Sequence, residues 1–299
     1  ILIIFNNKYR FSIGNNINLI DKPDKERKFH KFNTPLIGAF PLVITFILYS
    51  LIIEYQNSYF KGIMLASITF FLIGLIDDKK NISYKSKFFY SIIFLILFLS
   101  LNKSFLISHL VFETFKTTIP LLNSHSLTLT VICIIILINA FNFTDGINGL
   151  SSIIASLWMM LLLFLNKEIN YHLIFLSICI FLNAIPILNG KYFLGDNGAL
   201  FLGTIISLET IVLFNKNYSL ISYEQIFLIF MIPGIDMIRL ILLRLINNKN
   251  PFLPDRNHLH HLLIKKFSLK KTLLIYSLLI TIPVLISSFF EIKTIFLIL

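Results

Sequence analysis

Acidic side chains at the ends of apolar runs are the first candidates for chemistry in this sequence. Asp77 and Asp78 end a nearly charge-free run, and Asp196 follows a glycine in the stretch FLGDNGALFLG. Carboxylate oxygens are good ligands for Mg²⁺, and adjacent carboxylates repel each other unless a cation or a proton lies between them. They therefore indicate a cation site or a proton-transfer role. The simpler alternatives are a solvated helix end for the pair and an ordinary turn for Asp196.

The stretch NAFNFTDGINGL carries a second group of polar side chains. Asn139, Asn142 and Asp145 recur every three residues, so they would lie along one face of a helix. Gly146 and Gly149 allow a turn or a close approach of the backbone to a ligand. An ordinary helix end with turn glycines is the alternative, but amides inside a membrane span are costly unless they are paired.

The stretch PDRNHLHH combines a guanidinium with three imidazoles, Arg256, His258, His260 and His261. In a helix, His258 and His261 would share a face and His260 would point elsewhere. Arginine forms two hydrogen bonds with a phosphate, and imidazole N–H groups donate to phosphate oxygens as well. The cluster favours diphosphate binding over zinc, because the other motifs offer oxygen ligands that suit Mg²⁺. The alternative is a basic loop lying on anionic lipid headgroups.

One charged pair lies inside an apolar run. Asp236 and Arg239 are three residues apart and follow a Pro-Gly pair. Charges within the membrane are functional candidates, because burying them in lipid is expensive. An internal ion pair would explain them equally well, and the sequence leaves both interpretations open.

The composition defines the elements that must position these groups. Hydrophobic residues make up 56% of the 299 residues and charged residues only 14%, with a mean hydropathy of +0.82. Soluble domains carry about 25% charged residues. The sequence therefore predicts an all-α, polytopic membrane protein. The net charge of +11 fits basic cytoplasmic loops, and no soluble domain could present it to nucleic acid.

Nine apolar runs are long enough to cross a bilayer, and they form one transmembrane domain over residues 1–299. The predicted spans lie near 35–53, 59–76, 88–107, 118–139, 149–166, 171–189, 198–214, 224–246 and 271–290. A truncated first span at 1–5 and another beginning near 292 would bring the total to ten or eleven.

The connections between these spans alternate in charge. Most lysines and arginines lie in 6–34, 77–87, 140–148, 190–197 and 247–270, which the positive-inside rule assigns to the cytoplasm. Every polar motif lies in or beside this set, so the sequence predicts one site at the cytoplasmic membrane face. Its reactants would be a cytosolic molecule and a lipid. Acidic positions, amides, glycine loops and an Arg/His cluster suit phosphoryl-type transfer assisted by Mg²⁺.

Five motifs, in order between Asp21 and Leu263, carry a family resemblance. They are DKPDKERKFH…TPLIGA, GLIDD, NAFNFTDGINGL, FLGDNGALFLG and IPGIDMIRLILLRLINNKNPFLPDRNHLHHLL. The chain resembles the polyprenyl-phosphate N-acetylhexosamine-1-phosphate transferases. The form D-R-x-H-x-H-H is closer to the WecA-like branch than to the MraY, or muramyl-pentapeptide, branch.

The resemblance implies a multi-pass enzyme of the bacterial inner (cytoplasmic) membrane with its active site facing the cytoplasm. Such an enzyme transfers an N-acetylhexosamine 1-phosphate, here expected to be GlcNAc-1-phosphate, from a UDP-sugar to undecaprenyl phosphate. UMP is released, Mg²⁺ or Mn²⁺ is the cofactor, and the product begins a cell-envelope polysaccharide such as lipopolysaccharide O-antigen. A homodimer is compatible with this function, and no nucleic acid partner is implied.

The resemblance also implies residue roles. The catalytic groups would be Asp77, Asp78, Asp145, His258, His260 and His261, with Asp77 or Asp78 orienting or deprotonating the lipid phosphate. The metal ligands would be Asp196, Asp78 and Asn142. The substrate-binding groups would be Lys28, His30, Asn139, Asn142, Asn148 and Arg256.

Two departures and two rival functions follow from the same residues. The family usually has an aspartate where this chain has Asn148, and paired glycines where it has Gly38-Ala39. The motifs also fit a donor carrying a 6-deoxy-N-acetylhexosamine or UDP-MurNAc-pentapeptide, because they hold the diphosphate and not the sugar. A transporter using Asp236 and Arg239 would show inverted repeats, which the sequence does not.

Overall fold

A bundle of long apolar helices makes up most of the computed structural model. It describes residues 1–23, 32–52, 58–112, 114–166, 170–216, 221–250 and 257–289. Lys28, His30 and Arg256, with the span expected from residue 292, lie outside the described residues.

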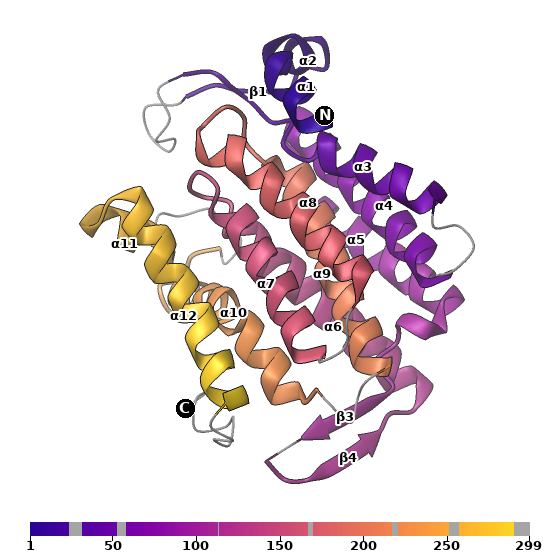
Figure 1. The fold of residues 1–299 in the computed structure, drawn as a ribbon. Coiled ribbons are helices and arrows are strands. Elements are labelled where there is room, and N and C mark those ends of the chain that lie inside the picture. The colour runs from indigo at the N-terminus through magenta and orange to yellow at the C-terminus, as the bar shows by residue number, and fades with distance from the viewer. Residues whose placement is uncertain are drawn as a thin grey trace.

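Each of the nine predicted spans corresponds to one helix of the bundle (Figure 1). The helices are α3 (Phe40–Ile52), α4 (Ser58–Lys80), α5 (Tyr84–Leu101), α6 (Asn123–Asn142), α7 (Leu150–Asn166), α8 (Tyr171–Leu188), α9 (Gly195–Lys216), α10 (Tyr223–Ile246) and α12 (Leu269–Phe289). Within the described part of the chain, seven of them are long and apolar enough to cross a membrane, and α3 and α7 are shorter apolar helices. The prediction of a polytopic helical membrane protein is confirmed.

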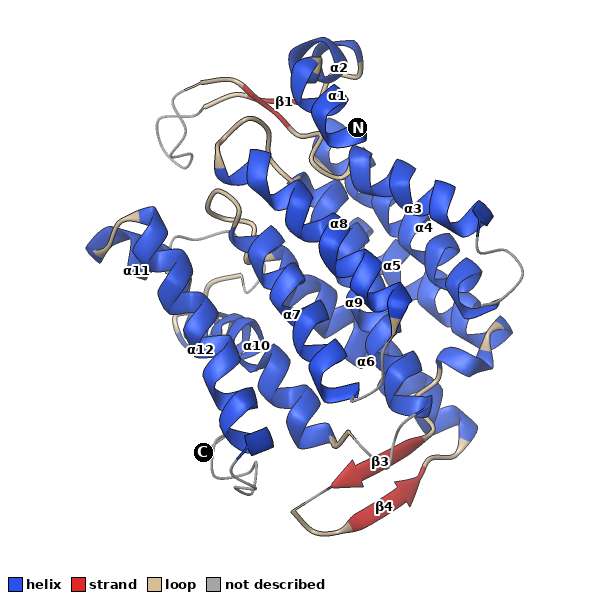
Figure 2. Cartoon of the chain, in the orientation of Figure 1, coloured by secondary structure: helices blue, strands red, loops and turns tan. Residues whose placement is uncertain are grey.

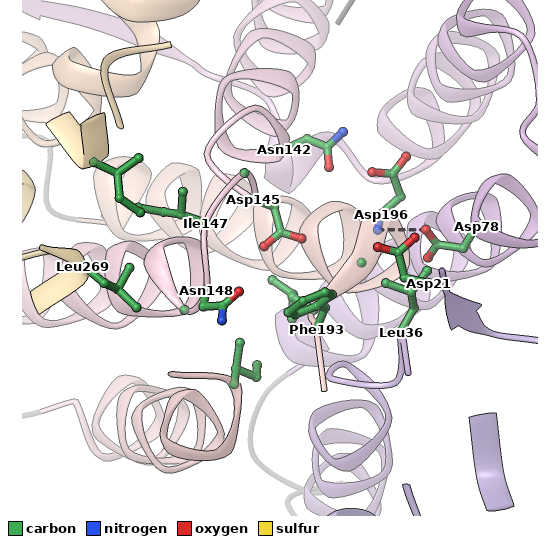
Figure 3. A pocket seen from close by; sticks show the side chains of 16 residues that line it. Asp21, Leu36, Asp78, Asn142, Asp145, Ile147, Asn148, Phe193, Asp196 and Leu269 are labelled. Carbon is green, nitrogen blue, oxygen red and sulfur yellow. Dashed lines mark hydrogen bonds between the residues drawn. The ribbon is translucent and has the colours of Figure 1, made fainter. Parts of the chain in front are cut away.

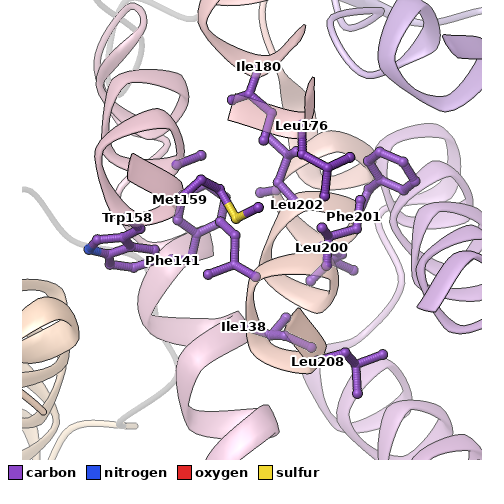
Figure 4. Packing of buried hydrophobic residues seen from close by; sticks show 14 of the residues in the cluster. Ile138, Phe141, Trp158, Met159, Leu176, Ile180, Leu200, Phe201, Leu202 and Leu208 are labelled. Carbon is purple, nitrogen blue, oxygen red and sulfur yellow. The ribbon is translucent and has the colours of Figure 1, made fainter. Parts of the chain in front are cut away.

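Helix α9 is the central element, because it packs most extensively against α4 and also against α6 and α7. Its side chains are buried from Asn197 to Phe214. The hydroxyls that this burial would strand, such as those of Thr204 and Ser207, donate to carbonyls one turn back at 2.8 and 2.7 Å. Apolar side chains of α6 to α9, among them Phe201 and Met159, fill the space between these helices (Figure 4).

Two short hairpins were not predicted from the sequence (Figure 2). Strands β1 (Ile20–Asp21) and β2 (Thr34–Pro35) pair near the N-terminus, and β3 (His109–Phe112) pairs with β4 (Thr117–Pro120) between α5 and α6. The predicted span 88–107 is too long, since α5 stops at Leu101 and a 3₁₀ turn, Lys103–Phe105, follows. Hydropathy alone does not separate the end of an apolar helix from the short apolar strand after it.

The remaining helices are short. Helices α1 (Leu2–Lys8) and α2 (Arg10–Asn16) form the N-terminal segment, where a truncated span was expected. Helix α11 (Leu259–Lys266) precedes α12 and carries two of the histidines. The β3–β4 hairpin lies at the end of the bundle opposite the α8–α9 connection (Figure 1). The two ends of α9 therefore lie at opposite ends of the bundle.

Candidate active site

A cavity of about 440 Å³ opens where α4 ends and α9 begins. Polar side chains from four of the sequence motifs line it, namely Asp21, Asp78, Asn142, Asp145, Asn148 and Asp196 (Figure 3). Asp78 and Asp196 alone are 118 residues apart in the chain. The structure thus brings four carboxylates and two amides to one end of the bundle.

Asp78 joins the end of α4 to the start of α9. Its Oδ1 accepts a hydrogen bond from the backbone N–H of Asp196 at 3.1 Å. Its Oδ2 accepts from the backbone N–H and the side-chain amide of Asn197, at 2.9 and 2.6 Å. A carboxylate at this position satisfies the free N–H groups of the first turn and lies at the positive end of the helix dipole. Asp78 therefore fixes the position of Asp196. The sequence had not indicated this role of Asp78.

A glycine makes this junction possible. Gly195 has φ +74°, in the left-handed region that favours glycine. A Cβ at Gly195 would lie 3.0 Å from both Asp78 Oδ2 and Asn197 Nδ2. The glycine therefore leaves room for the hydrogen bond between those two side chains.

Lys87 connects two of the predicted acidic residues. Its Nζ lies 2.8 Å from Asp77 Oδ2 and 2.5 Å from Asp196 Oδ2, and its side chain is only 16% exposed. The single ammonium group offsets one of the two negative charges at close range. Sequence reasoning counted Lys87 only among the basic loop residues. Its place in the first turn of an apolar helix, shortly after two aspartates, was a usable signal.

Asp145 lies in the turn between α6 and α7. Helix α6 ends at Asn142, so the predicted helical face through Asn139, Asn142 and Asp145 is wrong beyond Asn142. Burial raises the pKa of Asp145 to about 6, against the effect of the hydrogen bond that Ser151 donates to it at 2.6 Å. Asn139 donates to the carbonyl of Ile135 and is not among the residues that line the cavity.

The three histidines gather at the start of α11. The ring centroids of His258 and His260 are 5.4 Å apart, and those of His260 and His261 are 4.3 Å apart. The expectation that His260 would point elsewhere is wrong, because His258 is the non-helical N-cap residue, with φ −59° and ψ 147°. Both His260 Nε2 and His261 Nε2 face Gly146, which also lines the cavity.

His260 is neutral in this cluster. Burial and the adjacent imidazoles lower the pKa of His260 to about 3. The residue is 1% exposed, and neither ring nitrogen has a hydrogen-bond partner among the described residues. A neutral ring can donate one N–H, and a phosphate oxygen is a suitable acceptor.

Asp236 and Arg239 form the internal ion pair that the sequence left open. Arg239 Nη2 lies 2.8 Å from Asp236 Oδ1. Asp236 also accepts from His258 Nδ1 at 2.9 Å and from the backbone N–H of Leu259 at 3.1 Å. The pair is therefore part of the histidine cluster.

The donor set suits a magnesium ion. Asp78, Asp145 and Asp196 offer carboxylate oxygens, and the buried Oδ1 of Asn142 has no hydrogen-bond partner within the described part of the chain. Across those same residues, no three acidic, histidine or cysteine side chains are close enough to enclose a metal ion alone. Mg²⁺ keeps several waters and commonly binds one or two carboxylates together with substrate phosphates.

The fold and the cavity define a multi-pass membrane protein with an acidic, magnesium-suited pocket at the ends of its helices. The chain belongs to glycosyl transferase family 4, whose model matches residues 60–214. This match runs from α4 to α9 and includes Asp77, Asp78, Asn142, Asp145 and Asp196. The family resemblance inferred from the motifs is confirmed.

Several curated proteins are similar to the central part of the chain. The undecaprenyl-phosphate alpha-N-acetylglucosaminyl 1-phosphate transferase of Thermotoga maritima is 36% identical over 140 residues, which cover 46% of this chain and 43% of that protein. A probable undecaprenyl-phosphate N-acetylglucosaminyl 1-phosphate transferase of Bacillus subtilis is 30% identical over 142 residues, covering 46% and 40%. The chain spans less than half the length of these relatives.

Proposed function

We propose that this protein transfers a sugar 1-phosphate from a nucleotide diphosphate sugar to a polyprenyl phosphate in the membrane. The observation that carries the proposal is the convergence of Asp78, Asn142, Asp145 and Asp196 on one cavity at the end of membrane-type helices. Such a cavity can receive a lipid phosphate from the bilayer and a nucleotide from water. The names of the relatives support undecaprenyl phosphate as acceptor and N-acetylglucosamine 1-phosphate as the group transferred.

The donor would be UDP-N-acetylglucosamine and the leaving group UMP. An oxygen of the lipid phosphate forms a bond to the phosphorus that bears the sugar. The bond from that phosphorus to the bridging oxygen breaks, and its electron pair leaves with UMP. Because the phosphate oxygen is already a nucleophile, the protein chiefly has to position the reactants and stabilise charge.

Asp78, Asn142 and Asp196 would hold Mg²⁺ or Mn²⁺. When bound, the ion neutralises diphosphate charge and polarises the bridging oxygen. Both oxygens of Asp78 already accept hydrogen bonds from the first turn of α9, which makes Asp78 a poor general base. Asp77 is therefore the better candidate to orient the lipid phosphate, with Lys87 holding it beside Asp196.

The side of the cavity formed by Gly146 would receive the diphosphate. His260 and His261 lie against Gly146, where their N–H groups can reach an anion above the turn. Asn148 lines the same cavity and would accept hydrogen bonds without adding charge. Contacts of Lys28, His30 and Arg256 with phosphate stay predictions.

The test is UMP release by the purified protein with undecaprenyl phosphate and a panel of UDP-sugars. The panel includes UDP-N-acetylglucosamine, a 6-deoxy donor and UDP-MurNAc-pentapeptide. Asp196→Asn should lower turnover by roughly 100-fold or more, because it removes a carboxylate that would hold the ion that neutralises the diphosphate. Glu224→Gln is the matched control, since it makes the same change near the β3–β4 hairpin, where Glu224 Oε1 accepts from the Thr114 N–H. Absence of UMP release with every donor would refute the proposal.

We also propose that the cavity faces the cytoplasm of a bacterial inner membrane. Exposed Lys191 lies in the α8–α9 connection beside the cavity, and exposed Lys116 lies in the β3–β4 hairpin at the other end. In intact spheroplasts, a membrane-impermeant maleimide should label Lys116→Cys, and it should label Lys191→Cys only after lysis. The reverse pattern would place the cavity outside.

A further inference from the structure

Asp236 makes more hydrogen bonds than an ion pair with Arg239 requires. It is 6% exposed and lies in α10, whereas two of its partners, His258 and Leu259, belong to the start of α11. Its Oδ2 is 2.9 Å from His258 Nδ1, and both its oxygens are 3.1 Å from the backbone nitrogen of Leu259. One carboxylate thus fixes an imidazole ring and the first N–H of the helix that carries the other two histidines.

A carboxylate bonded to Nδ1 selects one form of the imidazole. Nδ1 must carry a proton to donate to Asp236, so Nε2 is left to accept a proton or to donate one to an anion. The ring position and the tautomer of His258 therefore both depend on Asp236.

The ring that Asp236 holds is linked to the cavity through His260, whose Nε2 faces the cavity-lining Gly146. His258 stacks on His260 at an interplanar angle of 12°, and its centroid is 5.4 Å from that of Phe143 in the α6–α7 connection. Arg239 completes the arrangement, because its Nη2 also donates to the carbonyl of Asn257 at 2.5 Å. The residue before the histidine cluster is thereby tied to α10.

We infer that Asp236 is a positioning residue that holds His258 in the Nδ1–H form, so that Nε2 can act on the anionic diphosphate of the donor. This inference rests on the proposed function. Among the residues that the structure describes, the charged and titratable groups facing His258 and Asp236 are Arg239 from α10, His260 and His261 from α11, and Tyr276 from α12. In this group of described residues, Asp236 supplies the negative charge.

Asp236→Asn tests the inference, because it keeps the size and one acceptor oxygen and removes the charge. We expect kcat to fall about 10–100-fold, as when a carboxylate that orients a histidine is lost, with the KM for the UDP-sugar nearly unchanged. Asp236→Glu should recover part of kcat. Glu224→Gln, on the same helix, should behave as wild type.

A measurement without substrate separates this inference from the proposed function. In ¹⁵N-histidine-labelled protein, the His258 signals, assigned by their loss in His258→Gln, should show a protonated Nδ1 in wild type and change in Asp236→Asn. Unchanged His258 signals in Asp236→Asn would overturn the inference, while turnover by the wild type would still uphold the proposed function. A change in the signals without turnover in wild type would leave the Asp236–His258 pairing standing and refute the transferase function.

Discussion

The close contact of α4 with α9 at Gly74 is the most sensitive structural support of the cavity. A Cβ at Gly74 would lie 2.6 Å from the backbone N and Cα of Asn197 and from the carbonyl oxygen of Asp196. Ordinary contact begins near 3.4 Å, so Gly74→Ala requires the helices to separate by about 0.8 Å. The atoms that must move belong to the backbone of the first turn of α9, and no side-chain rotation can relieve the overlap.

A displacement of that size reaches the acidic groups directly. The bonds from Asp78 to the N–H groups of Asn197 and Asp196, now 2.9 and 3.1 Å, would lengthen beyond the usual hydrogen-bond range. We expect Gly74→Ala to lower kcat about 10–100-fold, because shifts near 1 Å in a catalytic site cost about that much. Overpacking should also lower the free energy of unfolding by about 1–3 kcal/mol.

The assay is UMP release at saturating substrate, with thermal unfolding in detergent measured in parallel. Gly62→Ala is a matched control on α4, because its Cβ would meet the ring of Phe105, 2.7 Å away, far from the cavity. It should lower stability and leave kcat within about threefold of wild type. Gly234→Ala, whose Cβ would have no described atom within 4 Å, should change neither quantity. Wild-type kcat in Gly74→Ala, or an equal loss in Gly62→Ala, would refute the reasoning.

Three further predictions concern charge. Lys87→Met should lower the Mg²⁺ concentration needed for half-maximal thermal stabilisation about tenfold, because Lys87 competes with the metal for Asp196. An unchanged Mg²⁺ concentration would contradict this role of Lys87. The pKa of His260 is about 3 in the folded protein and about 6.5 in the unfolded chain. The free energy of unfolding should therefore fall by about 1.4 kcal/mol for each pH unit below 6.5. Melting temperatures between pH 7 and 5 should fall more steeply for the wild type than for His260→Gln. Glu209→Leu should lower the free energy of unfolding by about 1–3 kcal/mol, because it removes the hydrogen-bond partner 2.6 Å from His172 Nε2. The double variant Glu209→Leu, His172→Leu should cost less, and denaturant unfolding measures both.

The spans were predictable because the bilayer imposes a simple requirement on the sequence. Roughly twenty apolar residues are needed per helix, and each of the nine predicted runs overlaps one helix. The β3–β4 hairpin was not predicted, because His109–Phe112 continues the apolar character of α5 and its pairing with Thr117–Pro120 is a contact between segments. The hydropathy of each segment does not depend on which other segment it pairs with, so it cannot predict such pairing.

The amino-acid sequence by itself determined the membrane fold, the acidic and histidine motifs and the kind of ligand they suit. Only the tertiary structure decided the partners: Lys87 between Asp77 and Asp196, Asp78 on the first turn of α9, and Asp236 on His258. The physical reason is the distance over which each kind of interaction acts. Hydropathy acts residue by residue, so it can be read along a single helix, whereas hydrogen bonds and ion pairs act over about 3 Å between groups that only the packing of helices brings together.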